Sequence, residues 1–375
     1  MIKLKLLKFF LRDKVFIIAF SLALLSLFFV SPRVEQLKAI NINVLVIMFS
    51  LMISVAGLTE ANFFSKIAIF ITSKFFTIRY IGLVIVLSTF FLGMLVTNDA
   101  VLLTLVPFTL FVMRQTKEER YALTIVILQT FAANMGSALT PMGDPQNIYL
   151  YQYYDLGFFE FMGATFPITL SAFFLIMVTT YFLLPNTFIK PVMVDPKLDK
   201  KKIIVESIIF LFVILLILRI VSPFVTIGVA IILSLVFYPH LFKKPDYLLL
   251  FTFVSFFIFT YNLSSWTVLT DFMAKFLNTP QSVYFTGLLS SQFLSNVPAS
   301  ILLSTFTDKI YWRYLLQSVN VGAMGSLIAS LASLITFKFV IREFPNQSKT
   351  YILTYSVIGI IYIILLTCIV FIANQ

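Results

Sequence analysis

Residues 80–113 read YIGLVIVLSTFFLGMLVTNDAVLLTLVPFTLFVM. As one helix this stretch would be about 51 Å long at 1.5 Å per residue, which exceeds the roughly 30 Å hydrocarbon core of a bilayer. As two full spans, its second arm would run only from Ala100 to Met113 and would be too short to cross. We therefore predict a re-entrant hairpin with Thr97-Asn98-Asp99 at its tip.

Composition supports a membrane setting for this hairpin. The chain has 375 residues, of which 60% are hydrophobic and 11% charged, and its mean hydropathy is +1.01. One soluble core cannot bury so much apolar surface, so lipid must be the main solvent. The single cysteine, Cys368, excludes a disulfide framework and a thiolate metal site.

The net charge of +11 follows membrane topology. Most of the 27 Lys and Arg residues fall in loops on one side if the N-terminus is cytoplasmic, as the positive-inside rule requires. We expect a multi-pass protein of the cytoplasmic membrane with an extracytoplasmic C-terminus. Membrane lipid is then a partner, and the charge does not call for nucleic acid.

A second stretch, 281–307, also consists of two short apolar arms with a polar segment between them. Its arms, Gln281–Leu294 and Ala299–Thr307, are both too short to span, and Ser295-Asn296-Val297-Pro298 separates them. Non-helical polar backbone at this depth is tolerated only where protein or a water-filled cavity satisfies it. Both hairpin tips are therefore predicted to line an internal site.

An interrupted helix follows each hairpin. The first contains LQTFAANMGSALTPMGDPQNIYLY (128–151), and the second contains LQSVNVGAMGSLIASLASLITF (316–337). Asn134 then aligns with Asn320, and Gly136 with Gly322, both offset by 186 residues. Gly and Pro interrupt the first helix because Pro lacks an N–H donor and Gly tolerates unusual backbone angles.

These elements predict an all-α polytopic membrane protein built from two inverted repeats, each with a re-entrant hairpin and a discontinuous helix. Such repeats are typical of secondary transporters. The predicted divisions are a basic segment and first transmembrane helix (1–39), a first repeat (40–185; hairpin 80–113, broken helix 121–154), a cytoplasmic linker (186–202) and a second repeat (203–375; hairpin 281–307, broken helix 314–342).

The tips and breaks supply the candidate binding groups. Opened helix ends offer N–H groups that suit an anion, and amide or hydroxyl oxygens suit Na⁺. The predicted substrate-binding residues are Thr97, Asn98, Gly136, Ser137, Thr140, Asn147, Ser295, Asn296, Gly322 and Ser326. The predicted coupling-ion residues are Asp99, Asn134, Asp144, Asn320 and Ser330, with a Na⁺ site at Asn98, Asp99, Asp144 and Asn296.

Asp99 and Asp144 are the strongest candidates for functional residues, because no Lys or Arg occurs in their own segments to neutralise them. An ionised carboxylate at the bilayer centre costs roughly 2.5–3.5 kcal/mol even on mild scales. Bound Na⁺, a proton or opened backbone would offset this cost. In the purely structural alternative, Asp99 caps the second hairpin arm and Asp144 forms an Asx turn before Pro145.

The strings TNDAVLLTLVPF, ANMGSALTPMGDPQN, SNVPASILL and VGAMGSLIASLASL resemble the ion transporter superfamily of divalent-anion/sodium symporters, arsenite permeases and sodium/proton antiporters. The similarity runs from about Asn41 to Phe371. It implies an elevator-type transporter with a scaffold that forms a homodimer. Neither tip is a full Ser-Asn-Thr, and Gly143-Asp144-Pro145-Gln146-Asn147 stands where relatives often have Gly-Asn-Pro-Gln-Asn. The first departure argues against a dicarboxylate as the substrate, and the second leaves open whether Na⁺ or H⁺ is the coupling ion.

The resulting hypothesis is a permease, not an enzyme, that moves a small anion or oxyanion such as arsenite or a carboxylate, coupled to Na⁺ or H⁺ and without another cofactor. One alternative is a sodium/proton antiporter, in which the aspartates bind the transported ions. Another is a membrane subunit of an ATP-driven pump. The chain has no Walker motif, no HExxH motif and only one histidine, His240, so catalysis is not expected.

Overall fold

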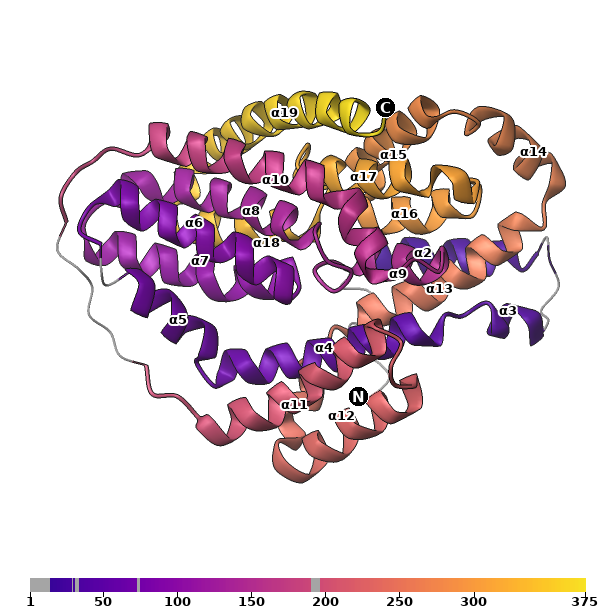
Figure 1. The fold of residues 1–375 in the computed structure, drawn as a ribbon, viewed down its shortest axis with the longest axis horizontal. Helices are drawn as coiled ribbons and strands as arrows, with labels where there is room; N and C mark the ends of the chain where they lie inside the picture. Colours follow the sequence, from indigo (N-terminus) through magenta and orange to yellow (C-terminus); the bar gives the residue numbers. More distant parts are fainter. Residues whose placement is uncertain (1–13, 29, 31–33, 73–74, 190–195) are drawn as a thin grey trace.

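The computed structural model describes residues 14–28, 30, 34–72, 75–189 and 196–375. Within these ranges the chain forms helices and loops, with one isolated bridge between Thr77 and Phe188. The basic start of the predicted segment 1–39 and the middle of the predicted linker 186–202 lie outside the described residues. The described fold is thus all-α, as predicted (Figure 1).

The first half of the chain ends with a long helix that reaches residue 183. Its helices are α2 (Lys14–Ser26), α3 (Val34–Lys38), α4 (Ile42–Glu60), α5 (Phe63–Thr72), α6 (Ile78–Leu95), α7 (Asn98–Gln115), η1 (Glu119–Tyr121), α8 (Ala122–Ser137), α9 (Pro145–Tyr153) and α10 (Phe158–Leu183). Helices α6 and α7 meet at residues 96–97, and α8 and α9 are separated by residues 138–144.

The second half has the same order of elements from α13 onward. Its helices are α11 (Lys200–Ile217), α12 (Pro223–Phe237), η2 (Pro239–Lys243), α13 (Tyr247–Ser264), α14 (Thr267–Phe276), α15 (Pro280–Leu294), α16 (Asn296–Ser304), η3 (Lys309–Tyr311), α17 (Trp312–Gly322), α18 (Leu331–Glu343), η4 (Pro345–Gln347) and α19 (Ser348–Ala373). Helices α15 and α16 meet at Ser295, and α17 and α18 are separated by residues 323–330.

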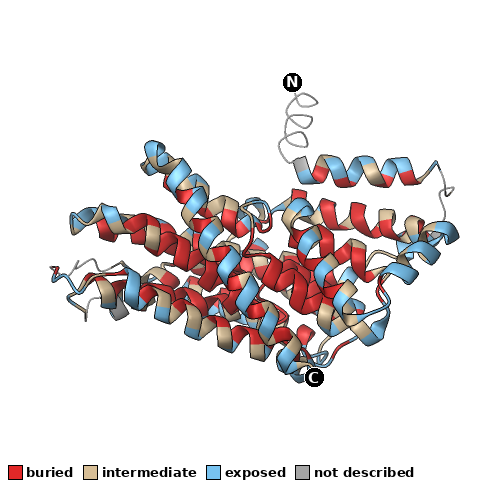
Figure 2. Cartoon of the chain, turned by 90° about the horizontal axis from the view of Figure 1, so that it is seen from above, coloured by how far each residue is buried: buried red, intermediate tan, exposed pale blue. Residues whose placement is uncertain are grey.

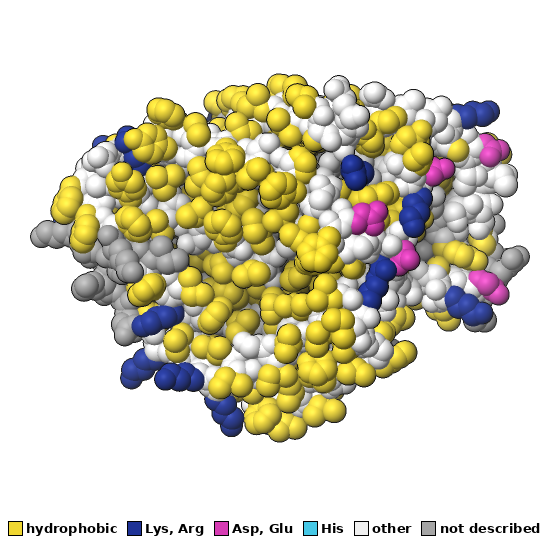
Figure 3. Space-filling view, viewed as in Figure 1, with side chains coloured by type: hydrophobic (Ala, Val, Ile, Leu, Met, Phe, Trp, Pro, Cys, Tyr) yellow, Lys and Arg dark blue, Asp and Glu magenta, His cyan; other side chains and the backbone are white. Residues whose placement is uncertain are grey.

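In the described part of the chain, five stretches are long and apolar enough to cross a membrane. They are Ile42–Glu60, Ile78–Leu95, Phe158–Leu183, Tyr247–Ser264 and Pro345–Ala373. Figure 3 shows hydrophobic side chains over most of the middle of one face, while charged side chains lie toward the two ends of the long axis. This distribution is what a protein surrounded by lipid requires, because charge is costly in hydrocarbon.

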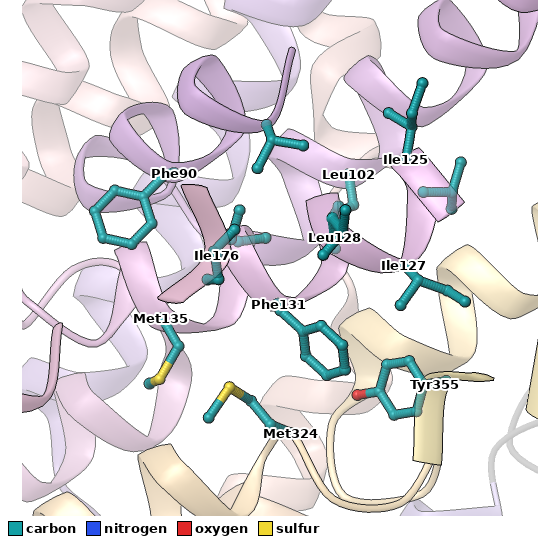
Figure 4. Packing of buried hydrophobic residues seen from close by; sticks show 14 of the residues in the cluster. Phe90, Leu102, Ile125, Ile127, Leu128, Phe131, Met135, Ile176, Met324 and Tyr355 are labelled. Atoms are coloured by element: carbon teal, nitrogen blue, oxygen red, sulfur yellow. The ribbon is translucent and has the colours of Figure 1, made fainter. Parts of the chain in front are cut away.

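The interrupted helix α8 forms the centre of the core. Nearly all of its residues are buried, and it packs against α6, α7, α10 and α18. Phe131 of α8 stacks on Tyr355 of α19 with ring centroids 4.7 Å apart, and Met135 points toward Met324 (Figure 4). Buried residues line the inner helices, whereas the outer helices are exposed on their outward sides (Figure 2). Helix α8 therefore holds its polar end in a tightly packed surrounding.

A separate helical bundle lies beside this core. Helices α4, α11 and α12 pack against one another, and α2 packs along α13. Ile53, Ile209, Ala230 and Leu241 form a small buried cluster within the α4–α11–α12 bundle. Helix α4 also contacts α9, and α13 contacts α16, so the bundle borders the second part of the first broken helix and one hairpin arm.

Candidate functional site

The first hairpin tip is bonded to the break between α8 and α9. The backbone N–H of Asn98 donates to the carbonyl of Gly143 over 3.0 Å. The Asn98 side-chain amide donates to Asp144 Oδ2 at 2.7 Å and to Asn134 Oδ1 at 3.0 Å. Its own Oδ1 accepts from the backbone N–H of Asp99 at 2.7 Å. Asn98 thus uses the whole of its amide, while only 1% exposed, to join the tip to the break.

The second tip is bonded to its own break in the same way. The backbone N–H of Asn296 donates to the carbonyl of Ala329 over 2.9 Å, and its Oδ1 accepts from the backbone N–H of Val297 at 2.9 Å. Ser295 has φ 73° and ψ 154°, a strained conformation for a residue other than Gly. The side-chain Nδ2 of Asn296 is buried and has no hydrogen-bond partner in the described structure. This tip therefore carries both backbone strain and an unused donor.

A second hydrogen bond between the hairpin and the broken helix occurs in both halves. The Thr140 hydroxyl donates to the carbonyl of Met94 over 2.6 Å, and the Ser326 hydroxyl donates to the carbonyl of Gln292 over 3.0 Å. Thr140 and Ser326 are offset by 186 residues, as are the two breaks, and Met94 and Gln292 by 198, as are the two tip asparagines. Each half therefore holds its hairpin against its broken helix with equivalent hydrogen bonds.

Each hairpin can approach its broken helix closely because a glycine lies near the C-terminal end of α8 and of α17. A Cβ on Gly136 would lie 2.0 Å from the carbonyl oxygen of Phe90, and one on Gly322 would lie 2.9 Å from Ser291 Cβ and 3.2 Å from the carbonyl oxygen of Leu288. Side chains at these positions would push the hairpin away. The two predicted substrate-binding glycines thus act here as packing positions.

The breaks of the two halves are interlocked. Ser330 donates to Asn134 Oδ1 at 3.2 Å, and Asn134 Nδ2 donates to the carbonyl of Ala323 at 3.4 Å. From the other half, Asn320 Nδ2 donates to Asn147 Oδ1 at 2.8 Å, and its Oδ1 accepts from Gln146 at 3.4 Å. The asparagine that precedes each break therefore bonds to the break of the other half. The two interruptions form one continuous polar centre.

Two carboxylates belong to this centre. Asp144 is 4% exposed and begins α9 without capping it through its side chain, so the Asx-turn alternative does not describe it. Its carboxylate faces Asn98, Ser137 and Gln146 and is close enough to Asp99 to interact electrostatically. Among the described residues, no Lys, Arg or His forms an ion pair with either aspartate. Negative charge here is met only by amides, hydroxyls and helix N-termini.

The structure brings most of the predicted site residues together around the two tips and the two breaks. Ser137 donates to the carbonyl of Asn134, and Asn147 donates to the carbonyl of Ser137. Thr97 is half-buried and gives no capping hydrogen bond to α7. Of the four predicted sodium-site residues, Asn98, Asp99 and Asp144 share one tip and break, whereas Asn296 belongs to the other tip.

Two glutamines also belong to this centre; the sequence placed Gln146 among the polar residues of the first break, without a binding role, and missed Gln292. Gln146 is fully buried, and its Oε1 has no hydrogen-bond partner in the described structure. Gln292 Oε1 accepts from the backbone N–H of Ser326, and its Nε2 donates to the carbonyl of Gly322. Each lies within three residues of a tip or a break, which is the sequence signal for it.

Comparison with known proteins identifies the class to which this centre belongs. A family model described as citrate transporter matches residues 7–311. The chain belongs to the citrate transporter family. This family lies within the superfamily that the sequence motifs predicted, so that prediction is confirmed. The match includes both hairpins and the first break, and it ends before α17.

Relatives of this citrate transporter family protein cover most of its length. An uncharacterized transporter of Methanocaldococcus jannaschii is 31% identical over 86% of this chain and 87% of its own. The inner membrane protein YbiR of Escherichia coli is 25% identical over 80% of each chain. The protein is therefore a multi-pass membrane transporter rather than an enzyme, and its substrate is a small molecule or an ion.

Proposed function

We propose that this protein is a secondary active transporter of the cytoplasmic membrane that moves a small anion, coupled to Na⁺ or H⁺ bound at Asp144. The observation that carries the proposal is the buried Asp144 carboxylate, bonded to Asn98 at 2.7 Å and without an ion-pair partner among the described residues. The family description favours a carboxylate as the anion. An oxyanion such as arsenite is the other candidate substrate.

The cation side of the proposal rests on the charge of Asp144. A buried carboxylate without a counter-ion is costly, and a bound cation or proton removes this cost. Asp99, the orphan Oε1 of Gln146 and the Asn134 amide oxygen supply further oxygen atoms in the same polar centre. Hard cations such as Na⁺ prefer oxygen ligands of this kind.

The anion side rests on helix ends and on one unused donor. Helices α7, α9, α16 and α18 all begin at a tip or a break, and helix N-termini attract negative charge. The unpartnered Nδ2 of Asn296 adds a donor at the second tip. We assign the anion to the side of Asn296 and Ser295 and the coupling ion to the side of Asp144.

The proposed mechanism is an elevator built from inverted repeats. Support comes from the equivalent bonds Asn98–Gly143 and Asn296–Ala329, which tie each hairpin to its broken helix. Hairpins and broken helices would then move as one body past the α4–α11–α12 bundle and α13. The homodimer expected of the scaffold, a cytoplasmic N-terminus and an extracytoplasmic C-terminus are part of the same proposal.

A sodium/proton antiporter is the second candidate. The paired carboxylates Asp99 and Asp144 favour it, because two acids without a described basic partner can bind cations alone. The two functions differ in whether an anion must cross with the cation.

Flux measurements in proteoliposomes test the proposal. Purified protein is reconstituted, an inward Na⁺ or H⁺ gradient is imposed, and uptake of radiolabelled citrate, succinate or arsenite is followed, with Asp144→Asn as the matched control. We expect gradient-driven uptake of an anion that the control lacks. Exchange of Na⁺ for H⁺ that proceeds equally well with no transportable anion present would contradict the anion proposal and favour the antiporter.

A further inference from the structure

A buried acid lies outside the polar centre, in the bundle of α4, α11 and α12. Glu206 of α11 is fully buried, and neither of its carboxylate oxygens has a hydrogen-bond partner in the described structure. Its backbone carbonyl accepts from the Ser54 hydroxyl of α4 at 2.7 Å. A buried carboxylate with both oxygens unbonded is a costly arrangement when it is ionised.

The surroundings of Glu206 offer few ligands for a metal ion. A Cβ on Gly57 of α4 would lie 2.5 Å from Glu206 Cδ, so the carboxyl group packs directly on the α4 backbone. Backbone carbonyls within α4, α11 and α12 are engaged in helix hydrogen bonds. No cluster of three or more His, Cys, Asp or Glu side chains occurs in the described ranges. A desolvated cation would therefore find too few oxygen ligands.

A second unpartnered polar group, on α12, lies at the same level of the bundle. Lys202, one turn before Glu206, has its Nζ 4.7 Å from the ring centroid of Tyr238, and Ile209, nearly one turn after Glu206, packs in one cluster with Ala230. These two contacts place Ser234, midway between Ala230 and Tyr238, at the level of Glu206. The Ser234 hydroxyl is also buried without a hydrogen-bond partner in the described part of the chain.

A cluster of charged groups lies at the exposed end of the bundle, beginning at Lys202, one turn before Glu206. Glu60 at the end of α4 accepts from Lys202 at 3.1 Å and from Lys244 at 2.6 Å, and its Oε2 lies 2.8 Å from His240 Nε2. His240 and Lys244 are about half exposed. Lys202 and Glu60 both act electrostatically on Glu206, as Glu206 and Asp199 do on Tyr238. Protons can thus be supplied at the exposed end of the bundle.

We propose that Glu206 is a proton-binding site in the α4–α11–α12 bundle, distinct from the site around Asp144. Its carboxylate takes one proton from solvent by way of the Glu60–His240 end and is neutral when the bundle is packed. On loss of that proton, Lys202 is the nearest cation and shifts its attraction from Glu60 toward Glu206. Because α4 also packs on α9, the site belongs to the bundle that borders the helix begun by Asp144.

Infrared difference spectroscopy of the full-length protein in lipid nanodiscs tests this proposal independently of transport. The C=O stretching band of a protonated carboxylic acid is followed between acidic and alkaline pH in wild type, Glu206→Gln and the exposed-acid control Glu160→Gln. We expect wild type and the control to keep a band at neutral pH that Glu206→Gln has lost in whole or in part. No such band in wild type, or an equal band in Glu206→Gln, would overturn the proposal.

Two further measurements test the proposal even if Glu206→Gln does not fold. The double variant Asp99→Asn/Asp144→Asn should keep the band, because it leaves Glu206 in place, and complete loss in this variant would assign the protonated acid to the polar centre instead. Adding NaCl at constant pH to this double variant, which lacks the Asp144 carboxyl, should leave the band unchanged. Its disappearance on adding sodium would show that the position takes a cation rather than a proton.

Discussion

The Asn98 side-chain amide donates to the Asp144 carboxylate over 2.7 Å and so bonds a hairpin tip to the break in the following helix. Hydrogen bonds to a charged group contribute more than neutral ones, and both residues are buried. In the second half, Asn296 stands in place of Asn98, but Ser330 stands in place of Asp144. The second half therefore lacks both the carboxylate and the side-chain bond that it makes, since Asn296 Nδ2 has no partner in the described structure.

This asymmetry predicts that Asp144→Asn removes the dependence of transport on the coupling ion, whereas Ser330→Ala weakens transport without changing that dependence. Losing a charged partner costs about 1.5–3 kcal/mol, or about 10- to 100-fold in ion affinity. Initial uptake rates in proteoliposomes across a series of Na⁺ concentrations and pH values measure both variants. Unaltered Na⁺ and pH dependence in Asp144→Asn would mean that the carboxylate is structural.

Gly136→Ala should destabilise the protein strongly, because the new Cβ would meet the carbonyl oxygen of Phe90 at 2.0 Å. Overpacking of this kind typically costs about 1–3 kcal/mol. Gly163→Ala is the matched control, since no atom lies within 4 Å of its Cβ position in α10, and alanine favours a helix by about 1 kcal/mol over glycine. Thermal unfolding in detergent should show a large drop for Gly136→Ala and none for Gly163→Ala. Equal behaviour of the two would contradict the tight contact between α6 and α8.

Asn320→Ala should separate the two breaks. It removes the bonds to Asn147 and Gln146 and leaves buried polar groups unpaired, at a cost of about 1–3 kcal/mol. Unfolding temperature measures the loss, with the exposed Asn278→Ala as control. An Asn320→Ala protein as stable as the control would show that the interlocking bonds contribute little.

Ser295→Gly should stabilise the resting protein, because glycine adopts the observed φ of 73° without strain. The strain of such a residue is of order 1–3 kcal/mol. If this strain is part of the transport cycle, uptake should fall while the unfolding temperature rises. A lower unfolding temperature would contradict the strained geometry at this tip.

Part of this arrangement could be predicted from sequence and part could not. The lengths of 80–113 and 281–307 and their polar centres sufficed to predict a helix pair at each, and the spacing of Asn134 and Asn320 sufficed to align the breaks. The bounds of the second arm of the first pair were wrong, because α7 begins at Asn98 in the tip itself and ends at Gln115, and so has 18 residues. The bonds Asn134–Ser330 and Asn320–Asn147 join residues more than 170 positions apart. They depend on how the halves pack, which no local pattern specifies.

The burial of Glu206 is a second feature that the sequence could not predict. Four residues after Lys202 it has the spacing of an ordinary helical ion pair, so its sequence gives no reason to single it out. In the fold, Lys202 bonds instead to Glu60 of α4, which is distant in sequence. This leaves the Glu206 carboxyl without a described hydrogen-bond partner. Only the packing of α4 on α11 through Gly57 makes this acid buried.

The proposed transport pathway requires above all that the two halves enter the membrane from opposite sides. Lys117 follows the first hairpin and Lys309 follows the second, and both are exposed. In a Cys368→Ser background, Lys117→Cys and Lys309→Cys are treated in intact cells with a membrane-impermeant thiol reagent, and then again in inverted vesicles. We predict labelling of Lys309→Cys only in cells and of Lys117→Cys only in inverted vesicles. Labelling of both from the same compartment would contradict the inverted arrangement and the transport pathway built on it.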